Sequence, residues 1–145
     1  MRTIIRPLIS ALAVAIFVAG VVPAFAEGGK KDADPSKSVS IEGTLIDTKC
    51  YAEDNNNTGN DHGGMKGCGT TCARMGIPVG ILVGGQKGGT VLILLAPSKA
   101  LAEYIGVSAR VTGTKPIGEG TLLPDKVEVK AKDGTFKQVD LTSMM

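Results

Sequence analysis

The sequence predicts a mainly β fold, a small OB-like barrel of five or six strands with one short helix in a cysteine-containing loop and another between strands three and four. Three observations support this prediction. Short segments alternate between apolar and polar residues or are continuously apolar, glycine-rich turns separate them, and a helical pattern falls between the third and fourth segments. That order is typical of an OB-like barrel. Closure would also remove the exposed edges that short strands otherwise present.

The N-terminal segment, residues 1–26, is typical of a secretory signal peptide. Arg2 and Arg6 make its start positive, residues 8–22 form an apolar run, and residues 24–26 (AFA) supply a cleavage site of small residues. We therefore predict export to the periplasm or the extracellular space. No stable membrane anchor is expected after cleavage, because the apolar run is shorter than the ~20 residues that span a bilayer.

The rest of the chain predicts a leader and one domain. Residues 27–37 are charged, contain glycine and proline and lack apolar periodicity, so we expect a flexible leader before a single domain over residues 38–145. The chain has 16 basic and 14 acidic side chains, and because Arg2 and Arg6 lie in the signal, the mature chain is balanced. With balanced charge and few aromatic residues, no nucleic-acid partner is expected.

The expected strands differ in pattern. The first alternates, with Val39, Ile41 and Leu45 on one face, which is typical of a half-buried strand. The third is almost continuously apolar, and Asp133-Gly134 is a strong two-residue hairpin signal between the last two. In order, the expected strands are residues 38–47, 79–83, 90–96, 107–113, 122–130 and 135–141.

Two short helices are expected between these strands. Residues 68–75 can form one, which Gly76 ends as a left-handed cap. The other begins at residues 97–98 (PS), carries an apolar stripe and ends at Gly106. Residues 48–66 are polar and rich in glycine and asparagine, so we predict a long irregular loop there, without a core element.

All three cysteines and the one histidine fall between Cys50 and Cys72. If residues 68–75 are helical, Cys68 and Cys72 share a face at a Cβ separation of ~5–6 Å, which suits two thiolates on one ion better than a disulfide. Cys50 and His62 could close over this pair and complete a Cys₃His site for zinc or copper. Asp47 would orient the histidine or a backbone donor. No organic cofactor is expected.

Two other uses of the cysteines stay open. Exported proteins usually fold in an oxidising compartment, so a disulfide from Cys50 to Cys68 or Cys72 could staple the loop of a structural or interaction domain and leave one spare thiol. Alternatively, Cys68 at a helix N-terminus could be an acidified thiol that acts with Cys72 in redox chemistry. The sequence indicates no other catalytic set, so the chain is otherwise not expected to be an enzyme.

A pattern of D-x-x-C, one histidine, C-x-x-x-C and G-I-P runs through residues 41–78. In this pattern the segment resembles a family of small exported bacterial domains. The resemblance implies an OB-like β fold and a shared site, without naming an activity. The residues that the resemblance places in that site are Asp47, Cys50, His62, Cys68 and Cys72.

Overall fold

A computed structural model describes residues 37–85, 89–115 and 119–142, which belong to the compact unit Asp32–Met145. The predicted signal peptide lies outside the described residues, as do the predicted leader up to residue 36 and the middle of the turn after the second strand. No helix in the described ranges is long and apolar enough to cross a membrane.

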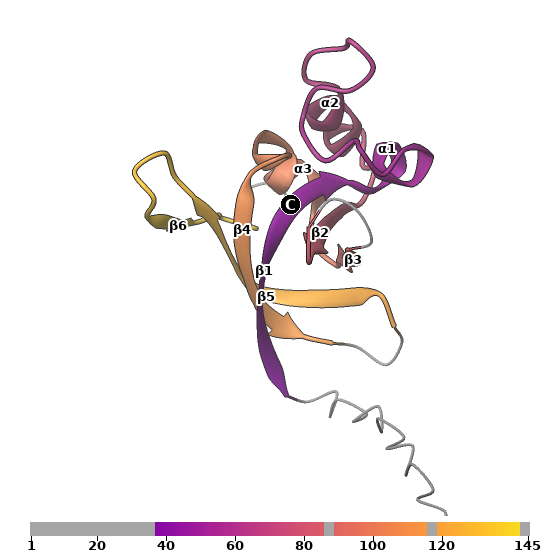
Figure 1. The fold of residues 1–145 in the computed structure, drawn as a ribbon. Coiled ribbons are helices and arrows are strands. Elements are labelled where there is room, and N and C mark those ends of the chain that lie inside the picture. The colour runs from indigo at the N-terminus through magenta and orange to yellow at the C-terminus, as the bar shows by residue number, and fades with distance from the viewer. Residues whose placement is uncertain (1–36, 86–88, 116–118, 143–145) are drawn as a thin grey trace, which may run out of the picture. The chain divides into compact units, whose positions relative to one another are not determined.

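Five strands close a barrel, and a sixth strand extends the sheet (Figure 1). The order is β3-β2-β1-β4-β5-β6, and parallel pairing of β3 with β5 closes the barrel. The prediction of a mainly β, OB-like barrel is therefore confirmed. The strands are β1 (Ser38–Asp47), β2 (Val79–Val83), β3 (Thr90–Leu94), β4 (Ser108–Thr114), β5 (Thr121–Lys130) and β6 (Phe136–Gln138).

The first strand, β1, has the bounds that the sequence predicts and links two neighbours. Its first part pairs with β4, and residues 44–47 pair with β2. Leu45 and Ile46 are both fully buried, although successive residues of a strand point to opposite faces. Both faces are therefore covered at the end of β1, where the chain enters the cysteine-containing segment.

Aliphatic side chains fill the core, as the scarcity of aromatic residues requires. A short helix, α3 (Ser98–Leu101), and a 3₁₀ turn, η1 (Ala102–Tyr104), bury Leu101 and Ala102 completely against this core and confirm the helix predicted between the third and fourth strands. Gly106 follows with φ of 85°, a conformation that glycine adopts without strain. The largest aliphatic core residues are Leu45, Ile81, Leu92, Leu94, Leu101, Ile105 and Leu122.

The segment between β1 and β2 is more ordered than predicted. Residues 68–75 were expected to be helical, and α2 (Cys68–Arg74) confirms this. The prediction of a wholly irregular loop over residues 48–66 is wrong at its start, because α1 (Thr48–Glu53) follows β1 directly. A helix of six residues is too short to show the apolar periodicity by which a helix is usually recognised.

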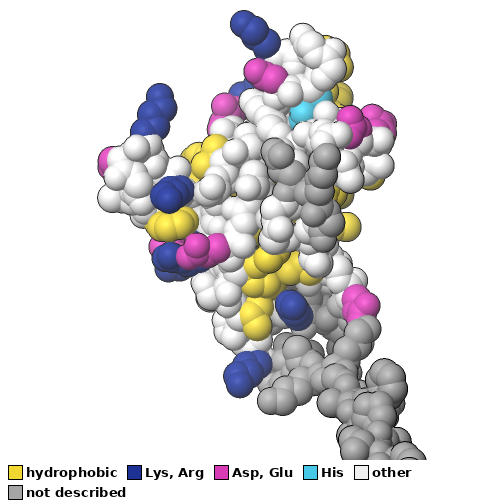
Figure 2. Space-filling model, in the orientation of Figure 1, with side chains coloured by type: hydrophobic (Ala, Val, Ile, Leu, Met, Phe, Trp, Pro, Cys, Tyr) yellow, Lys and Arg dark blue, Asp and Glu magenta, His cyan; other side chains and the backbone are white. Residues whose placement is uncertain are grey.

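Charged side chains of both signs are scattered over the face drawn in Figure 2. Exposed ion pairs of this kind contribute little to stability, typically ~0–1 kcal/mol each, so the aliphatic core is the main stabilising element. The ion pairs in the described residues include Lys49–Glu53, Arg74–Glu103, Arg110–Glu42 and Lys126–Glu128.

Close packing of β1 against β2 makes Gly43 sensitive to substitution. A Cβ at this position would lie 2.3 Å from the carbonyl oxygen of Leu82 and 2.8 Å from Cγ1 of Ile81. We expect Gly43→Ala to lower the free energy of unfolding by about 1–3 kcal/mol, as overpacking typically does. Gly59→Ala is the control, because a Cβ there meets nothing within 4 Å. Equal melting temperatures for the two variants would contradict this packing.

Candidate metal centre

The four predicted metal ligands come together where β1 ends and α1 and α2 meet. Their donor atoms fall into two groups, and within each group all the donor atoms lie within 4.8 Å of one another. The histidine set consists of Cys50, His62 and Cys68, and the aspartate set consists of Asp47, Cys50 and Cys72. Cys50 belongs to both sets. The structure thus brings all four predicted residues into one cluster and places Asp47 among the donors.

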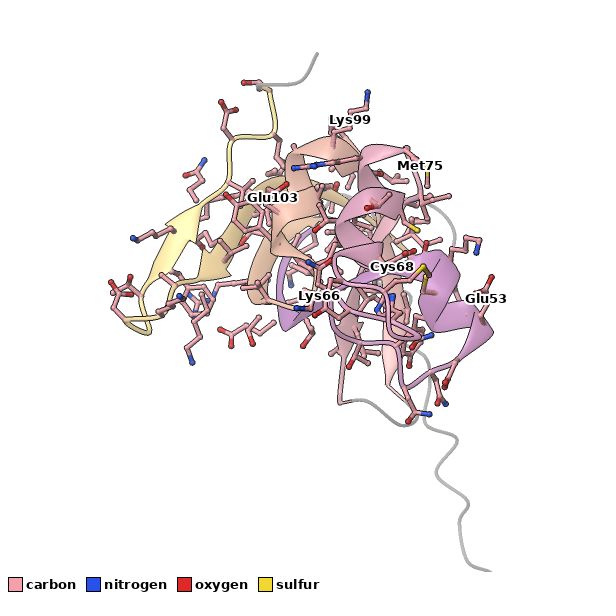
Figure 3. All side chains as sticks on the ribbon, turned by 90° about the horizontal axis from the view of Figure 1, so that it is seen from above. Glu53, Lys66, Cys68, Met75, Lys99 and Glu103 are labelled. Carbon is pink, nitrogen blue, oxygen red and sulfur yellow. The ribbon has the colours of Figure 1, made fainter. Side chains whose placement is uncertain are left out.

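The two cysteines of α2 do not form the pair that the sequence predicts. Cys68 and Cys72 lie one helical turn apart as expected, but they belong to different sets, and each is grouped with Cys50 of α1. Figure 3 shows Cys68 between the ribbons of α1 and α2. The centre is therefore built across two helices, and sequence analysis missed this arrangement because it did not detect α1.

Most of the cluster is shielded from solvent. The relative exposure is 1% for Asp47, 5% for His62, 6% for Cys50 and 8% for Cys72, whereas Cys68 is half-buried. All three cysteines are free thiols, so the stapling disulfide considered above is not formed in this structure. Cys68 is the member of the cluster that a solute reaches most readily.

A tight turn holds His62 in place. The backbone N–H of His62 donates to the carbonyl oxygen of Met65 at 3.2 Å, and that of Met65 donates back to His62 at 2.8 Å. Gly63 and Gly64 between them have φ of 55° and 83°, as a two-residue type I′ turn requires. These two glycines contribute to the composition that predicts an irregular loop, but in the structure they form the tight turn that positions His62.

The hydrogen bonds of the His62 ring leave one nitrogen available as a ligand. Nε2 lies 2.6 Å from the carbonyl oxygen of Gly59, and because a carbonyl only accepts, Nε2 carries the proton and donates. Nδ1 therefore bears the lone pair, and it is buried without a hydrogen-bond partner. Metal-binding histidines usually donate their other ring N–H to a carbonyl or carboxylate in this way.

The two carboxylate oxygens of Asp47 have different environments. Oδ1 caps α1 by accepting from the backbone N–H groups of Lys49 at 2.9 Å and Cys50 at 3.4 Å. This confirms that Asp47 accepts from backbone donors, whereas the Nε2 proton of His62 goes to Gly59 instead. Oδ2 is buried and has no hydrogen-bond partner. Burying a polar atom without a hydrogen-bond partner costs free energy. Oδ2 is therefore suited to bind a cation held by the aspartate set.

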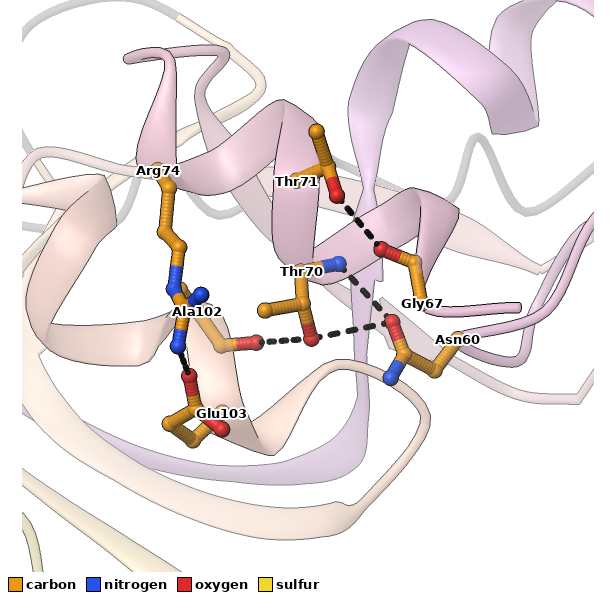
Figure 4. A network of polar contacts seen from close by, with 7 residues as sticks. All are labelled: Asn60, Gly67, Thr70, Thr71, Arg74, Ala102 and Glu103. Atoms are coloured by element: carbon orange, nitrogen blue, oxygen red, sulfur yellow. Dashed lines mark hydrogen bonds and ion pairs between the residues drawn. The ribbon is translucent and has the colours of Figure 1, made fainter. Parts of the chain in front are cut away.

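Polar contacts join α2 to the preceding loop and to η1 (Figure 4). The side-chain oxygen of Asn60 accepts from the backbone N–H of Thr70 at 2.8 Å and from its hydroxyl at 3.1 Å. The one proton of this hydroxyl is shared between Asn60 and the carbonyl oxygen of Ala102, which lies 2.9 Å from the hydroxyl oxygen, and Arg74 pairs with Glu103. Asn60 thus serves as an anchor in a stretch that composition alone marks as irregular.

Burial and a neighbouring carboxylate keep two of the thiols protonated. Burial, followed by hydrogen bonding with Asp47 and the negative charge of Asp47, raises the pKa of Cys50 to about 12. The pKa of Cys72 rises to about 11 for the same reasons in the same order. In the absence of a cation, Cys50 and Cys72 are therefore neutral thiols at neutral pH.

The three thiols are expected to differ in their reaction with iodoacetamide. In reduced, metal-free protein near pH 8, Cys68 should be alkylated first because it is half-buried, while Cys50 and Cys72 are buried and protonated. Mass mapping of the modified peptides over time checks this order. Alkylation of Cys50 or Cys72 before Cys68 would contradict the arrangement, and unfolded protein, in which all three react alike, is the control.

Fold and site together define a small OB-like barrel with a compact, largely buried group of cysteine, histidine and aspartate donors. Comparison of the chain with protein-family models, with curated proteins and with solved structures found no match. What the site does must therefore be argued from its own geometry.

Proposed function

We propose that this chain is an exported domain that holds a soft transition-metal ion, zinc or copper, through Cys50, His62, Cys68 and Cys72. The observation that carries the proposal is the state of His62. Its Nδ1 is buried and unpartnered while Nε2 is fixed to Gly59, and one of its ring nitrogens lies within 4.8 Å of the sulfurs of Cys50 and Cys68. A role in packing alone would leave that nitrogen unsatisfied, and burial of His62 to 5% exposure keeps it from bulk water, whereas a cation would satisfy it.

The chemistry of the donors supports a soft or borderline ion. Thiolate and imidazole together are typical ligands of zinc, and copper(I) also favours thiolates. Cys50 and Cys72 are protonated without a cation, so metal binding would release their protons, and the bonds from the metal to the thiolates would have to offset the free-energy cost of that release. The site is arranged so that the fold holds the donors close together before the ion arrives.

Zinc uptake by the reduced protein tests this proposal. We expect the purified domain to compete with a chromophoric chelator for zinc, and His62→Ala to weaken its affinity by at least about 10–100-fold, the scale of loss for disturbed metal sites. Asp61→Asn is the matched control, since Asp61 lies in the same loop but its Oδ1 accepts from Gly67 instead. Equal affinities for wild type, His62→Ala and Asp61→Asn would refute the proposed site.

A disulfide that staples the loop is the second candidate, because the sulfur of Cys50 lies within 4.8 Å of those of both Cys68 and Cys72. Such a pair would leave one thiol and compete with the metal for the same sulfurs. Thiol counting on protein recovered from the exported fraction distinguishes the two: three thiols after metal removal support the metal site, and one thiol supports the disulfide.

Export is proposed from the signal-like pattern of residues 1–26. Protein recovered from the exported fraction should begin at Glu27, and N-terminal sequencing checks this. Full-length chain retained in the cytoplasm would contradict it.

A further inference from the structure

We propose that the centre takes two divalent ions of the zinc class, bridged by the thiolate of Cys50. One ion would be held by the histidine set and the other by the aspartate set, so that Asp47 is a direct ligand. This inference rests on the proposed metal-binding function and goes beyond it in the number of ions, their charge and the role of Asp47.

The donors form two sets with one shared member. Within the described residues, no group of mutually close donors contains His62 and Asp47 together; His62 groups with Cys68, and Asp47 groups with Cys72. Three donors of one ion at ~2.0–2.3 Å are separated by no more than ~4 Å, which each set can reach with small movements. Cys50 is the donor common to both sets, and a thiolate sulfur has lone pairs for two ions.

Each set also contains one buried atom without a hydrogen-bond partner. The buried side-chain atoms without a hydrogen-bond partner, among the residues that the structure describes, are His62 Nδ1 and Asp47 Oδ2. One belongs to the histidine set and the other to the aspartate set. A single ion in the histidine set would satisfy His62 and leave the carboxylate of Asp47 buried beside the neutral thiol of Cys72, a weak donor, with no cation. Two ions satisfy both atoms.

The charge of the donors also favours two divalent ions. With the three cysteines as thiolates and Asp47 as a carboxylate, the five donors of the two sets carry four negative charges, and two divalent ions neutralise them. One divalent ion in the histidine set would leave Cys72 a neutral thiol and the carboxylate of Asp47 an uncompensated negative charge in a largely buried cluster, which is unfavourable. Two copper(I) ions would leave two of the four negative charges uncompensated. Lys49 is exposed and already paired with Glu53 at 2.7 Å. The carboxylate oxygen is also a harder ligand than copper(I) prefers, and zinc accepts it.

Native mass spectrometry of the reduced protein, loaded with zinc, counts the ions. We expect two per chain in the wild type, and one in both Asp47→Asn and Cys72→Ser, which each remove a donor from the aspartate set alone. Asp47→Asn keeps an Oδ1 that can cap α1, so the helix should be retained, and an unchanged circular dichroism spectrum checks this. Asp61→Asn, a carboxylate of the same loop outside both sets, should keep two ions.

The outcomes separate this inference from the proposed function. One ion in the wild type that His62→Ala abolishes and Asp47→Asn leaves in place would overturn the two-ion centre and keep the single Cys/His site. Two ions in Asp47→Asn would overturn the role of Asp47 as a ligand. No bound zinc in reduced, folded wild type would overturn both proposals.

Discussion

Cys50→Ser is expected to cause the largest loss of metal affinity of any single substitution in this chain. Cys50 is the one residue that contributes a donor to both the histidine set and the aspartate set. Its replacement by a serine hydroxyl, a poor ligand for zinc, would break both. Because disturbing the residues behind a metal ligand already costs ~10–100-fold, we expect loss of the ligand itself to lower zinc affinity by more than about 100-fold.

A matched control for Cys50→Ser is available on the same helix. Ala52→Ser introduces the same side chain at an exposed position of α1 that belongs to neither set, and its zinc affinity should equal that of the wild type. Chelator competition under reducing conditions measures both variants. If Cys50→Ser retained wild-type affinity while Cys68→Ser or His62→Ala lost it, Cys50 would not be the shared ligand.

Saturating zinc is expected to raise the melting temperature of the reduced domain by roughly 10 °C or more, and removal of the metal by a chelator should reverse the shift. An ion that binds only the folded state at about 100 times its Kd stabilises by ~2.7 kcal/mol. For a domain of about 100 residues, each kcal/mol corresponds to ~4–8 °C. The donors lie on β1, α1, the loop and α2, so the ion would join segments that otherwise separate on unfolding.

The shift caused by zinc should also depend on pH, with a defined sign. Because the pKa is raised to about 12 for Cys50 and to about 11 for Cys72, the metal must displace protons from both thiols. Displacement becomes harder as the proton concentration rises. The shift should therefore be larger at pH 8 than at pH 6. Thermal unfolding with and without zinc at these pH values measures it, and a shift that grew as the pH fell would contradict thiolate ligation.

Most of the barrel could be predicted because its strands carry clear local signals. The apolar alternation in β1 is typical of a half-buried strand, and the near-continuous apolar run of β3 is typical of a buried one. Asp133-Gly134 marks the turn before β6, and Gly134 has a positive φ of 84° there. The strand β6 is shorter than expected, Phe136–Gln138 against the predicted residues 135–141. Pairing with β5, rather than the pattern of the segment itself, sets its length.

The identity of the site residues could also be predicted, but their grouping could not. Clustering of cysteine and histidine in one stretch of sequence identified the candidate ligands that the structure brings close together. Which of them lie close together depends on α1, whose six residues carry no periodic signal. Asp47 could have predicted the start of α1, because aspartate is a preferred N-cap residue. That helix turns Cys50 toward α2.

The order within residues 54–67 depends on contacts that composition hides. Asn60 holds Thr70 through its side chain, and Gly63 and Gly64 form the turn that presents His62. Asparagine and glycine are common both in irregular loops and in tight, specific turns. Only the tertiary contacts distinguish the two cases, so a prediction from this segment's composition alone favours irregularity.

X-ray absorption at the zinc edge of the reduced, zinc-loaded domain is the most direct test that these cysteines and His62 form a metal centre. We expect a dominant shell of sulfur atoms at ~2.3 Å with a smaller shell of nitrogen or oxygen at ~2.0–2.1 Å. A spectrum of oxygen and nitrogen neighbours alone would show that the zinc is bound elsewhere, and would contradict the account.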